Sequence, residues 1–243
     1  SGFEGDIVVV ATNITKETVE KLTDEGVKVA AYGKQVDGGF QSESKMAPHV
    51  ERFFWIWNHL SNVRNEYRYA IVTDTRDVIF QADPTPFMEQ NCFLRPLIGS
   101  SEGMFYRDEP WGNKNLVDTF GMYFKALVDQ NLILNVGVLG GDIDYVTDLL
   151  LMIFQMSLNR PVPIVDQAVY NFLASQQPYL DAIHIANNKD NWAVQLGTTK
   201  YAIEAGNGDI GQRAVNDPTF MDLYLKTYQD IQPEIKGHEV FND

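Results

Sequence analysis

The chain has 243 residues and a mass of 27.5 kDa, which fits one α/β domain of ordinary size with a substantial core. Hydrophobic residues make up 44% of the chain, and the net charge is −14. This acidity opposes extended contact with phosphate backbones or anionic lipid, so we expect no nucleic-acid partner. No apolar run approaches the roughly 18–20 residues that cross a bilayer, so we expect a soluble protein without a membrane span.

Cys92 is the single cysteine, which allows no internal disulfide and no multi-thiolate metal site. Its apolar neighbours favour a packing role. Ser1-Gly2 resembles the remnant of a cleaved tag, and no signal peptide precedes the first expected strand. These features lead us to expect a cytoplasmic location and leave open that the chain is one domain of a longer protein.

The first elements follow in β-α-β order. Residues 6–11 form a β-branched run typical of a buried strand, and residues 27–32 form another. Between them, Thr15 can cap a helix and Gly26 can end it. This order predicts a right-handed crossover and an α/β fold with a mostly parallel central sheet flanked by helices.

A polar loop is expected over residues 35–44, followed by a helix from about residue 47 to 60. Apolar side chains recur on that helix at helical spacing and should face the core: Val50, Phe53, Phe54, Trp57 and Leu60. Arg52 falls outside this stripe. It fits either a solvated side chain or a contact to the phosphate or base of a nucleotide.

The next strand, within residues 67–73, runs directly into Asp74, and Asp77 follows three residues later. In open α/β sheets, ligands bind outside the carboxyl ends of the strands. Carboxylates there can hold Mg²⁺ or Mn²⁺, which fill their other positions with water and substrate phosphates. The pair predicts a binder of nucleotide diphosphates, although an aspartate after a strand also commonly caps a turn.

Further along, residues 102–120 show no clear periodicity, and we expect an irregular acceptor-side or lid loop there. No repeats or linkers interrupt the chain, which predicts one domain over residues 1–243. The remaining expected elements are strands at 97–101, 132–139, 182–186 and 192–196, and helices at 143–158, 166–174 and about 218–229.

The stretch Thr73-Asp74-Thr75-Arg76-Asp77-Val78-Ile79-Phe80-Gln81 resembles the Asp-x-x-Asp variant of the Asp-x-Asp motif in nucleotide-sugar glycosyltransferases of the GT-A fold. Together with four further matches that follow in order along the chain, this stretch resembles the amino-terminal domains of chlorovirus glycosyltransferases that modify capsid protein. The resemblance covers most of the chain. It implies a single GT-A-like (Rossmann-like) domain. The further matches are Gly99-Ser100-Ser101-Glu102, Asn135-Val136-Gly137-Val138-Leu139-Gly140-Gly141, Asp166-Gln167-Ala168-Val169-Tyr170-Asn171 and Gln195-Leu196-Gly197-Thr198.

The resemblance implies that Asp74 and Asp77 hold Mn²⁺ or Mg²⁺. It also implies a set of contacts to the nucleotide-sugar donor, made by Thr12, Arg52, Asp74, Gly137 and Gly140. Read from the residues alone, Thr12 equally fits a hydroxyl at a helix approach. The glycines can let a substrate approach the backbone closely, or they can mark a bulge or turn.

The resemblance places Asp166 and Gln167 beside the donor sugar. A carboxylate there can bind hydroxyls or deprotonate the acceptor, and an amide can steady developing charge. Asp166 also precedes a helix, where an aspartate is an obvious N-cap. Glu102 is the rival general base, and Asp142 is a third. A family histidine near the carboxyl end has no match, since neither His184 nor His238 lies in its motif.

These observations together predict a metal-dependent glycosyltransferase that moves a sugar from a nucleotide diphosphate, a UDP-sugar, to a hydroxyl of a glycan or glycoprotein. A sugar-1-phosphate nucleotidyltransferase would normally carry a Gly-rich loop after the first strand, which Ala11-Thr12-Asn13-Ile14 lacks. A phosphatase of the Asp-x-Asp-x-Thr type has a shorter spacing between its aspartates. A catalytically silent glycan-binding domain of the same fold is the alternative from another class.

Overall fold

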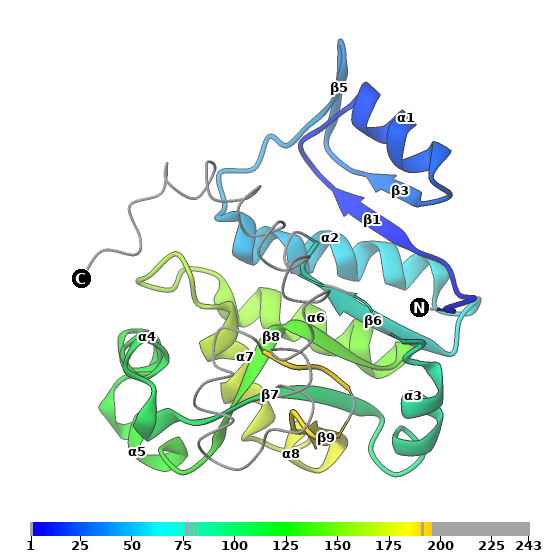
Figure 1. Ribbon diagram of the computed structural model, residues 1–243. Coiled ribbons are helices and arrows are strands. Elements are labelled where there is room, and N and C mark those ends of the chain that lie inside the picture. The colour runs from blue at the N-terminus through cyan, green and yellow to red at the C-terminus, as the bar shows by residue number, and fades with distance from the viewer. Residues whose placement is uncertain (1, 76–77, 79, 81, 191, 196–243) are drawn as a thin grey trace, which may run out of the picture.

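The computed structural model describes residues 2–75, 78, 80, 82–190 and 192–195, which form a mixed α/β fold (Figure 1). Its amino-terminal part has the expected β-α-β order. Strand β1 (Val8–Ala11) pairs in parallel with β3 (Lys28–Ala31), and α1 (Lys16–Asp24) connects them. Thr15 caps α1 by accepting a hydrogen bond from the Thr18 N–H at 3.2 Å. The predicted β-α-β order with parallel strands and the Thr15 cap are therefore confirmed.

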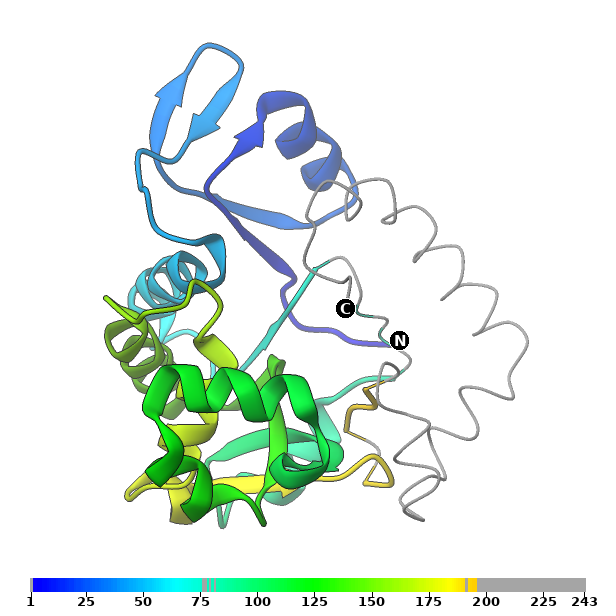
Figure 2. The same cartoon turned by 90° about the vertical axis from the view of Figure 1, so that its left-hand side faces the viewer.

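The polar loop expected over residues 35–44 is wrong, because this segment forms a hairpin. Strands β4 (Lys34–Val36) and β5 (Gly39–Gln41) pair antiparallel, and β5 also pairs with β2 (Ile14–Thr15). Asp37-Gly38 is a favoured two-residue hairpin turn, and Gly38 has the positive φ of 91° that such turns need. The hairpin projects at the top of the molecule in Figure 2.

The central sheet has four strands in the order β6 (Tyr69–Thr73), β8 (Leu132–Asp142), β7 (Leu97–Phe105) and β9 (Ile183–Ala186). Strand β8 runs antiparallel to both β6 and β7, whereas β7 and β9 are parallel. The prediction of a mostly parallel sheet is therefore wrong, and the sheet is mixed. The helices that follow β7 lead the chain back to the edge of the sheet at which β7 ends. Strand β8 starts there and therefore runs in the opposite direction.

These helices occupy the segment expected to be irregular. Strand β7 continues to Phe105, a 3₁₀ turn follows at Tyr106–Asp108, and α4 (Pro110–Phe120) and α5 (Met122–Val128) complete the connection. The Glu109 carboxylate caps α4 through the backbone N–H groups of Trp111 and Gly112. Tyr106 and Leu116 are buried in a local apolar cluster. The expectation of an irregular loop is wrong, because a capped helix occupies residues 110–120, and the acceptor-side or lid role of the segment stays a prediction.

The main core lies between one face of the four-stranded sheet and three helices, α2 (Pro48–Val63), α6 (Ile143–Ser157) and α7 (Asp166–Ala174). Val50 and Phe53 of α2 are buried in it, as the helical spacing predicts. Helix α3 (Thr85–Asn91) belongs to a smaller cluster that includes Ile98 and Ala186. Helix α8 (Tyr179–Ala182) leads into β9.

Some expected elements are not found or fall outside the described residues. Residues 192–195 are not in a strand, and the Trp192 ring packs against the face of the sheet at Gly140. Residues 196–198, the expected helix at 218–229 and His238 lie outside the described residues. Within the described ranges, none of the helices combines the length and apolar character needed to span a bilayer.

Candidate functional site

Four of the motifs quoted above meet at one edge of the central sheet. Strands β6, β7 and β9 run in the same direction, so their carboxyl ends lie together. Asp74 directly follows β6, and Glu102 lies in the second half of β7. Asn135 and Gly137 of β8 cross this edge, where Asn135 is opposite Ser100 and the Asp74 N–H donates to the Gly137 carbonyl at 2.9 Å.

Arg52 of α2 joins two carboxylates from distant parts of the chain. Its Nη1 donates to Oδ1 of Asp74, and its Nη2 donates to Oδ2 of Asp166 at 2.9 Å. The Asp166 side chain is only 4% exposed, whereas that of Asp74 is 38% exposed. Val165 occupies the N-cap position of α7, so Asp166 is the first helical residue. The interpretation of Asp166 as an N-cap is therefore wrong, and its carboxylate is held by Arg52.

A bulge in β8 shapes this edge. Gly99 pairs with Leu139 but the next residue, Ser100, pairs with Asn135, so residues 136–138 bulge out of the ladder between β7 and β8. A Cβ added to Gly137 would lie 2.6 Å from Oδ2 of Asp74 and 2.9 Å from Oδ1 of Asn135. Because Gly137 has no side chain, the carboxylate of Asp74 and the amide of Asn135 can lie close to its backbone.

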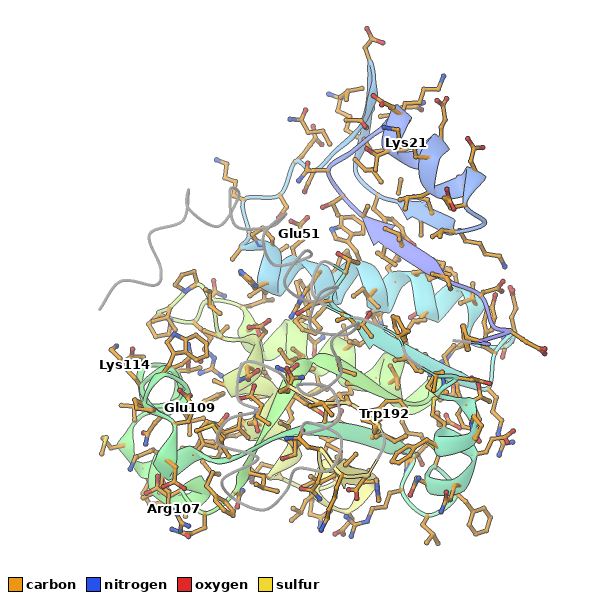
Figure 3. All side chains as sticks on the ribbon, viewed as in Figure 1. Lys21, Glu51, Arg107, Glu109, Lys114 and Trp192 are labelled. Carbon is orange, nitrogen blue, oxygen red and sulfur yellow. The ribbon has the colours of Figure 1, made fainter. Side chains whose placement is uncertain are left out.

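Gly140 lies in a different environment. A Cβ there would be 3.1 Å from two ring carbons of Trp192 and 3.2 Å from the Ala70 carbonyl. The Trp192 indole, labelled in Figure 3, packs over the glycine and donates from Nε1 to the Ser100 hydroxyl at 2.9 Å. Close packing of an aromatic ring on the sheet thus accounts for this glycine. Its predicted contact to the donor stays a prediction.

Glu102 lies in a network of amides. Its Oε1 accepts hydrogen bonds from Nδ2 of Asn135 at 3.1 Å and from Nε2 of Gln167 at 3.2 Å. The other end of each amide binds the bulge: Gln167 Oε1 accepts from the Val136 N–H at 3.4 Å, and Asn135 Oδ1 accepts from the Gly137 N–H at 2.8 Å. The backbone of β8 therefore fixes the orientation of both amides.

The pKa of Glu102 is raised above 4.5, chiefly because the carboxyl is buried. Hydrogen bonds from Asn135 and Gln167 oppose this effect, and the negative charge of Glu109 adds to it. A carboxylate with a raised pKa holds a proton more readily than an ordinary one. The site therefore pairs a proton-accepting carboxylate, Glu102, with a second carboxylate, Asp166, that is engaged by a guanidinium.

Two residues of this site were not singled out from the sequence as functional. Asn135 joins Glu102 to Gly137, as described above. Asn171 of α7 is buried and pairs with both the N–H and the carbonyl of Leu134 at 2.8 Å, so its side chain replaces a strand partner beside the bulge. A polar residue among the apolar positions of a helix was the available signal, since buried polar groups are hydrogen-bonded.

Thr12 and Arg52 line a pocket of about 120 Å³, together with Val10, Pro48, Glu51 and Trp55. Trp55 also lines a wider and more open pocket of about 600 Å³, with Gly33, Lys34, Ser42, Glu43 and Ser44. Its indole stacks on Tyr32 at 4.9 Å and donates to Oε1 of Glu51 at 2.8 Å. Glu51, near the start of α2 in Figure 3, thus holds in place the Trp55 ring that lines the pocket beside Arg52.

Of the two aspartates predicted to hold a metal ion, only Asp74 lies within the described residues. Asp74 offers carboxylate oxygen at the strand end, in space that Gly137 keeps open. Asp77 lies outside the described residues, and among those described no three His, Cys, Asp or Glu side chains are grouped to hold a metal. Asp142 caps α6 through the Asp144 N–H at 3.0 Å, and His184 lies in β9 against Phe87.

The comparisons with known proteins found no matching family model and no matching curated protein. Among solved structures, the chain is similar to a glycosyltransferase involved in the glycosylation of the major capsid of PBCV-1. The two share 13% sequence identity with a TM-score of 0.44, and the match covers 75% of this chain and 82% of that one. A likeness at this level assigns neither the fold nor the activity of the chain.

Proposed function

We propose that the protein is a metal-dependent glycosyltransferase that moves a sugar from a nucleotide diphosphate, a UDP-sugar, to a hydroxyl of a glycan or glycoprotein. The observation that carries this proposal is the convergence of four motif segments on one edge of the sheet. Their side chains, Asp74, Glu102, Asn135, Asp166 and Gln167, are linked by hydrogen bonds or share the space above Gly137.

Charge at the site supports a cation as cofactor. Two carboxylates, those of Asp74 and Asp166, pair with the guanidinium of Arg52, and a third, that of Glu102, lies in the amide network at the same edge of the sheet. A sugar diphosphate carries negative charge of its own, so such a site would repel it without a further cation. Asp74, with Asp77, would hold Mn²⁺ or Mg²⁺, which would neutralise the leaving diphosphate.

The donor would extend from this edge toward α2. Its diphosphate would lie near Asp74 and Arg52, and its nucleoside would enter the pocket lined by Thr12 and Trp55. An aromatic side chain that is already fixed by Glu51 and Tyr32 loses little conformational freedom when a base or ribose packs against it. This orientation leaves the sugar beside Glu102, Asp166 and Gln167.

In the transfer itself, the acceptor oxygen bonds to the anomeric carbon while the bond from that carbon to the diphosphate oxygen breaks. The electron pair of the broken bond stays on the nucleoside diphosphate, and the hydroxyl proton passes to Glu102. We assign this proton to Glu102 because its burial favours the protonated form. Asp166, held by Arg52, would orient a sugar hydroxyl, and the Gln167 amide would keep Glu102 in place.

The proposal is tested by isothermal titration with UDP, UDP-glucose, UDP-galactose, UDP-N-acetylglucosamine and GDP-mannose, each with and without Mn²⁺. We expect at least one nucleotide sugar to bind at least tenfold more tightly with the metal, and Asp74→Asn to abolish that gain. Asp24→Asn, a change at an exposed residue that ends α1, is the matched control and should bind like the natural protein.

Turnover separates an enzyme from a silent glycan-binding domain. We expect slow release of free UDP from the preferred donor by hydrolysis, accelerated by an acceptor sugar, and a loss of at least a hundredfold in Glu102→Gln. Metal-independent binding, or metal-dependent binding without any turnover across an acceptor panel, would contradict the proposed transferase. Glu102→Gln with normal turnover would instead return the proton-accepting role to Asp166.

A further inference from the structure

Arg52 binds two carboxylates that differ in how easily they can change partners. Its Nη2 donates to Asp166, whose side chain is only 4% exposed, and its Nη1 donates to Asp74, whose side chain is 38% exposed. A buried carboxylate that loses its cationic partner is strongly destabilised, whereas an exposed carboxylate can take water or another ion instead. The bond to Asp166 should therefore be permanent, and the bond to Asp74 should be exchangeable.

The guanidinium of Arg52 also has unused hydrogen-bonding capacity. A guanidinium carries five N–H donors, and the Nε atom of Arg52 is buried without a hydrogen-bond partner within the described part of the chain. An unpaired buried donor is costly, so a ligand that supplies acceptor oxygens to this side chain would be favoured. Arg52 lines the pocket of about 120 Å³ that Thr12 and Trp55 share, so space for such a ligand adjoins it.

Asp74 presents its two carboxylate oxygens to different surroundings. Oδ1 accepts from Arg52, whereas Oδ2 lies beside Gly137, where an added Cβ would be 2.6 Å away. Asp74 cannot serve a divalent cation and keep the guanidinium on the same carboxylate without bringing like charges together. The proposed cation and Arg52 should therefore compete for Asp74.

We infer that Asp74 exchanges partners when the donor binds. It pairs with Arg52 in the free protein and passes to the divalent cation in the donor complex, and the Nη1 that is released then binds the diphosphate. Asp166 keeps Nη2 throughout, so the guanidinium turns at the site without leaving it. A guanidinium suits this task because its parallel N–H donors match phosphate oxygens.

This inference rests on the proposed function and deepens it, because it makes Arg52 the residue that couples metal binding to nucleotide binding. In the natural protein, Mn²⁺ should strengthen the binding of UDP, and UDP should strengthen the binding of Mn²⁺ by the same factor, since coupling between two ligands is reciprocal. The role of Arg52 in this coupling is tested by two affinities that one substitution should change in opposite directions.

The first measurement is the affinity for Mn²⁺ without nucleotide, followed through the electron paramagnetic resonance signal of free Mn²⁺. Arg52→Lys keeps one positive charge, which should pair with the buried Asp166 and leave Asp74 free. We expect it to bind Mn²⁺ about fivefold more tightly than the natural protein, the effect of removing a competing ion pair worth about 1 kcal/mol. Arg64→Lys, just after α2, is the matched control, because Arg64 pairs with the exposed Asp144.

The second measurement is the affinity for UDP at saturating Mn²⁺, obtained by titration calorimetry. Arg52→Lys should bind UDP about tenfold more weakly, because the ammonium is committed to Asp166 and offers the phosphate no parallel pair of donors. A substitution that merely loosened the structure would weaken both affinities. Arg52→Met combined with Asp166→Asn removes both charges of the buried pair and provides the same comparison if the lysine variant does not fold.

The outcomes separate this inference from the proposed function. Unchanged or weaker Mn²⁺ binding in folded Arg52→Lys overturns the exchange at Asp74, even if the affinity for UDP falls. Unchanged affinity for UDP in that variant overturns the transfer of Nη1 to the diphosphate. Both results leave the proposed function standing if the natural protein binds nucleotide sugars with Mn²⁺. Absence of metal-dependent nucleotide binding in the natural protein overturns the proposed function and this inference together.

Discussion

Arg52 is the residue on which the electrostatic balance of the site depends. Its guanidinium faces two carboxylates, of which Asp166 is almost fully buried and Asp74 is partly exposed. An exposed pair contributes little to stability, whereas a buried charge that loses its partner is costly. The two halves of this bridge should therefore contribute unequally to stability.

We predict that Arg52→Met destabilises the protein by about 3 kcal/mol, because it leaves the Asp166 charge buried without its partner. Adding Asp166→Asn should recover a large part of that loss, whereas adding Asp74→Asn should recover little. Urea unfolding measures each free energy. Arg64→Met is the matched control. Arg64 lies at the end of α2 and pairs with the exposed Asp144 of α6, so its replacement should cost less than about 1 kcal/mol. Equal costs for the two arginines would contradict the buried bridge.

Glu102 should make the stability of the protein depend on pH. Its pKa in the folded chain lies above the usual 4.5, chiefly through burial. As the pH rises, the unfolded chain therefore loses this proton first, and Glu102 lowers the free energy of unfolding between the two pKa values and above them. The penalty is absent at a pH well below 4.5, where both states are protonated.

We predict that Glu102→Gln melts at a higher temperature than the natural protein at pH 7.5, with the difference shrinking at pH 4. The hydrogen bonds from Asn135 and Gln167 both reach Oε1 of Glu102, and the amide oxygen of glutamine can accept them in the same way. A gain of about 1 kcal/mol would appear as roughly 2–4 °C in a chain of this size. Thermal unfolding over this pH range measures the effect, with Glu89→Gln on α3 as control. A gain that is the same at both pH values would mean that ionisation of Glu102 is not its cause.

At the scale of elements, the bulge of β8 and the start of α7 form one unit. Gln167 and Asn171 lie one turn apart on α7 and bind the backbone of β8 at Val136 and Leu134. The same strand gives the site Asn135 and the open space at Gly137. Helix α7 therefore positions the catalytic candidates and the backbone beneath them together.

We predict different consequences for the two glycines of this strand. Gly137→Ala should weaken Mn²⁺-dependent donor binding at least tenfold, because the new methyl group would displace the side chains of Asp74 and Asn135. A Cβ at this position would lie 2.6 Å from Oδ2 of Asp74 and 2.9 Å from Oδ1 of Asn135. Gly140→Ala should cost about 1–3 kcal/mol of stability by overpacking against Trp192, with donor binding preserved. Titration calorimetry and urea unfolding on both variants separate the two effects. Loss of donor binding in Gly140→Ala at full stability would place that glycine in the site after all.

At the scale of the whole molecule, the net charge of −14 predicts self-repulsion that salt relieves. We expect the melting temperature to rise by a few degrees between 10 and 150 mM NaCl. MnCl₂ should raise it further than NaCl of matched ionic strength, because a ligand that binds only the folded state stabilises it. Asp74→Asn should remove this excess and keep the response to NaCl. Identical effects of the two salts would argue against a specific cation site.

Local sequence features determined several parts of this structure. The first β-α-β unit and its Thr15 cap follow from periodicity and capping, and the bounds of α7 follow from periodicity, all of which act between residues close in the chain. The strand that leads into Asp74 was likewise predicted from its apolar run. The hairpin at Asp37-Gly38 carried its own turn signal as well, and the polar composition of its strands obscured it.

Tertiary structure alone decided the rest. The direction of β8 depends on how the helices after β7 return the chain, and the bulge at residues 136–138 depends on how β8 pairs with β7. Arg52 and Asp166 are separated by 114 residues, and no local pattern announces that they form an ion pair. The sequence by itself thus predicted which residues are candidates for the chemistry. The packing of distant segments decided which of them meet, because burial and hydrogen bonding depend on neighbours in space.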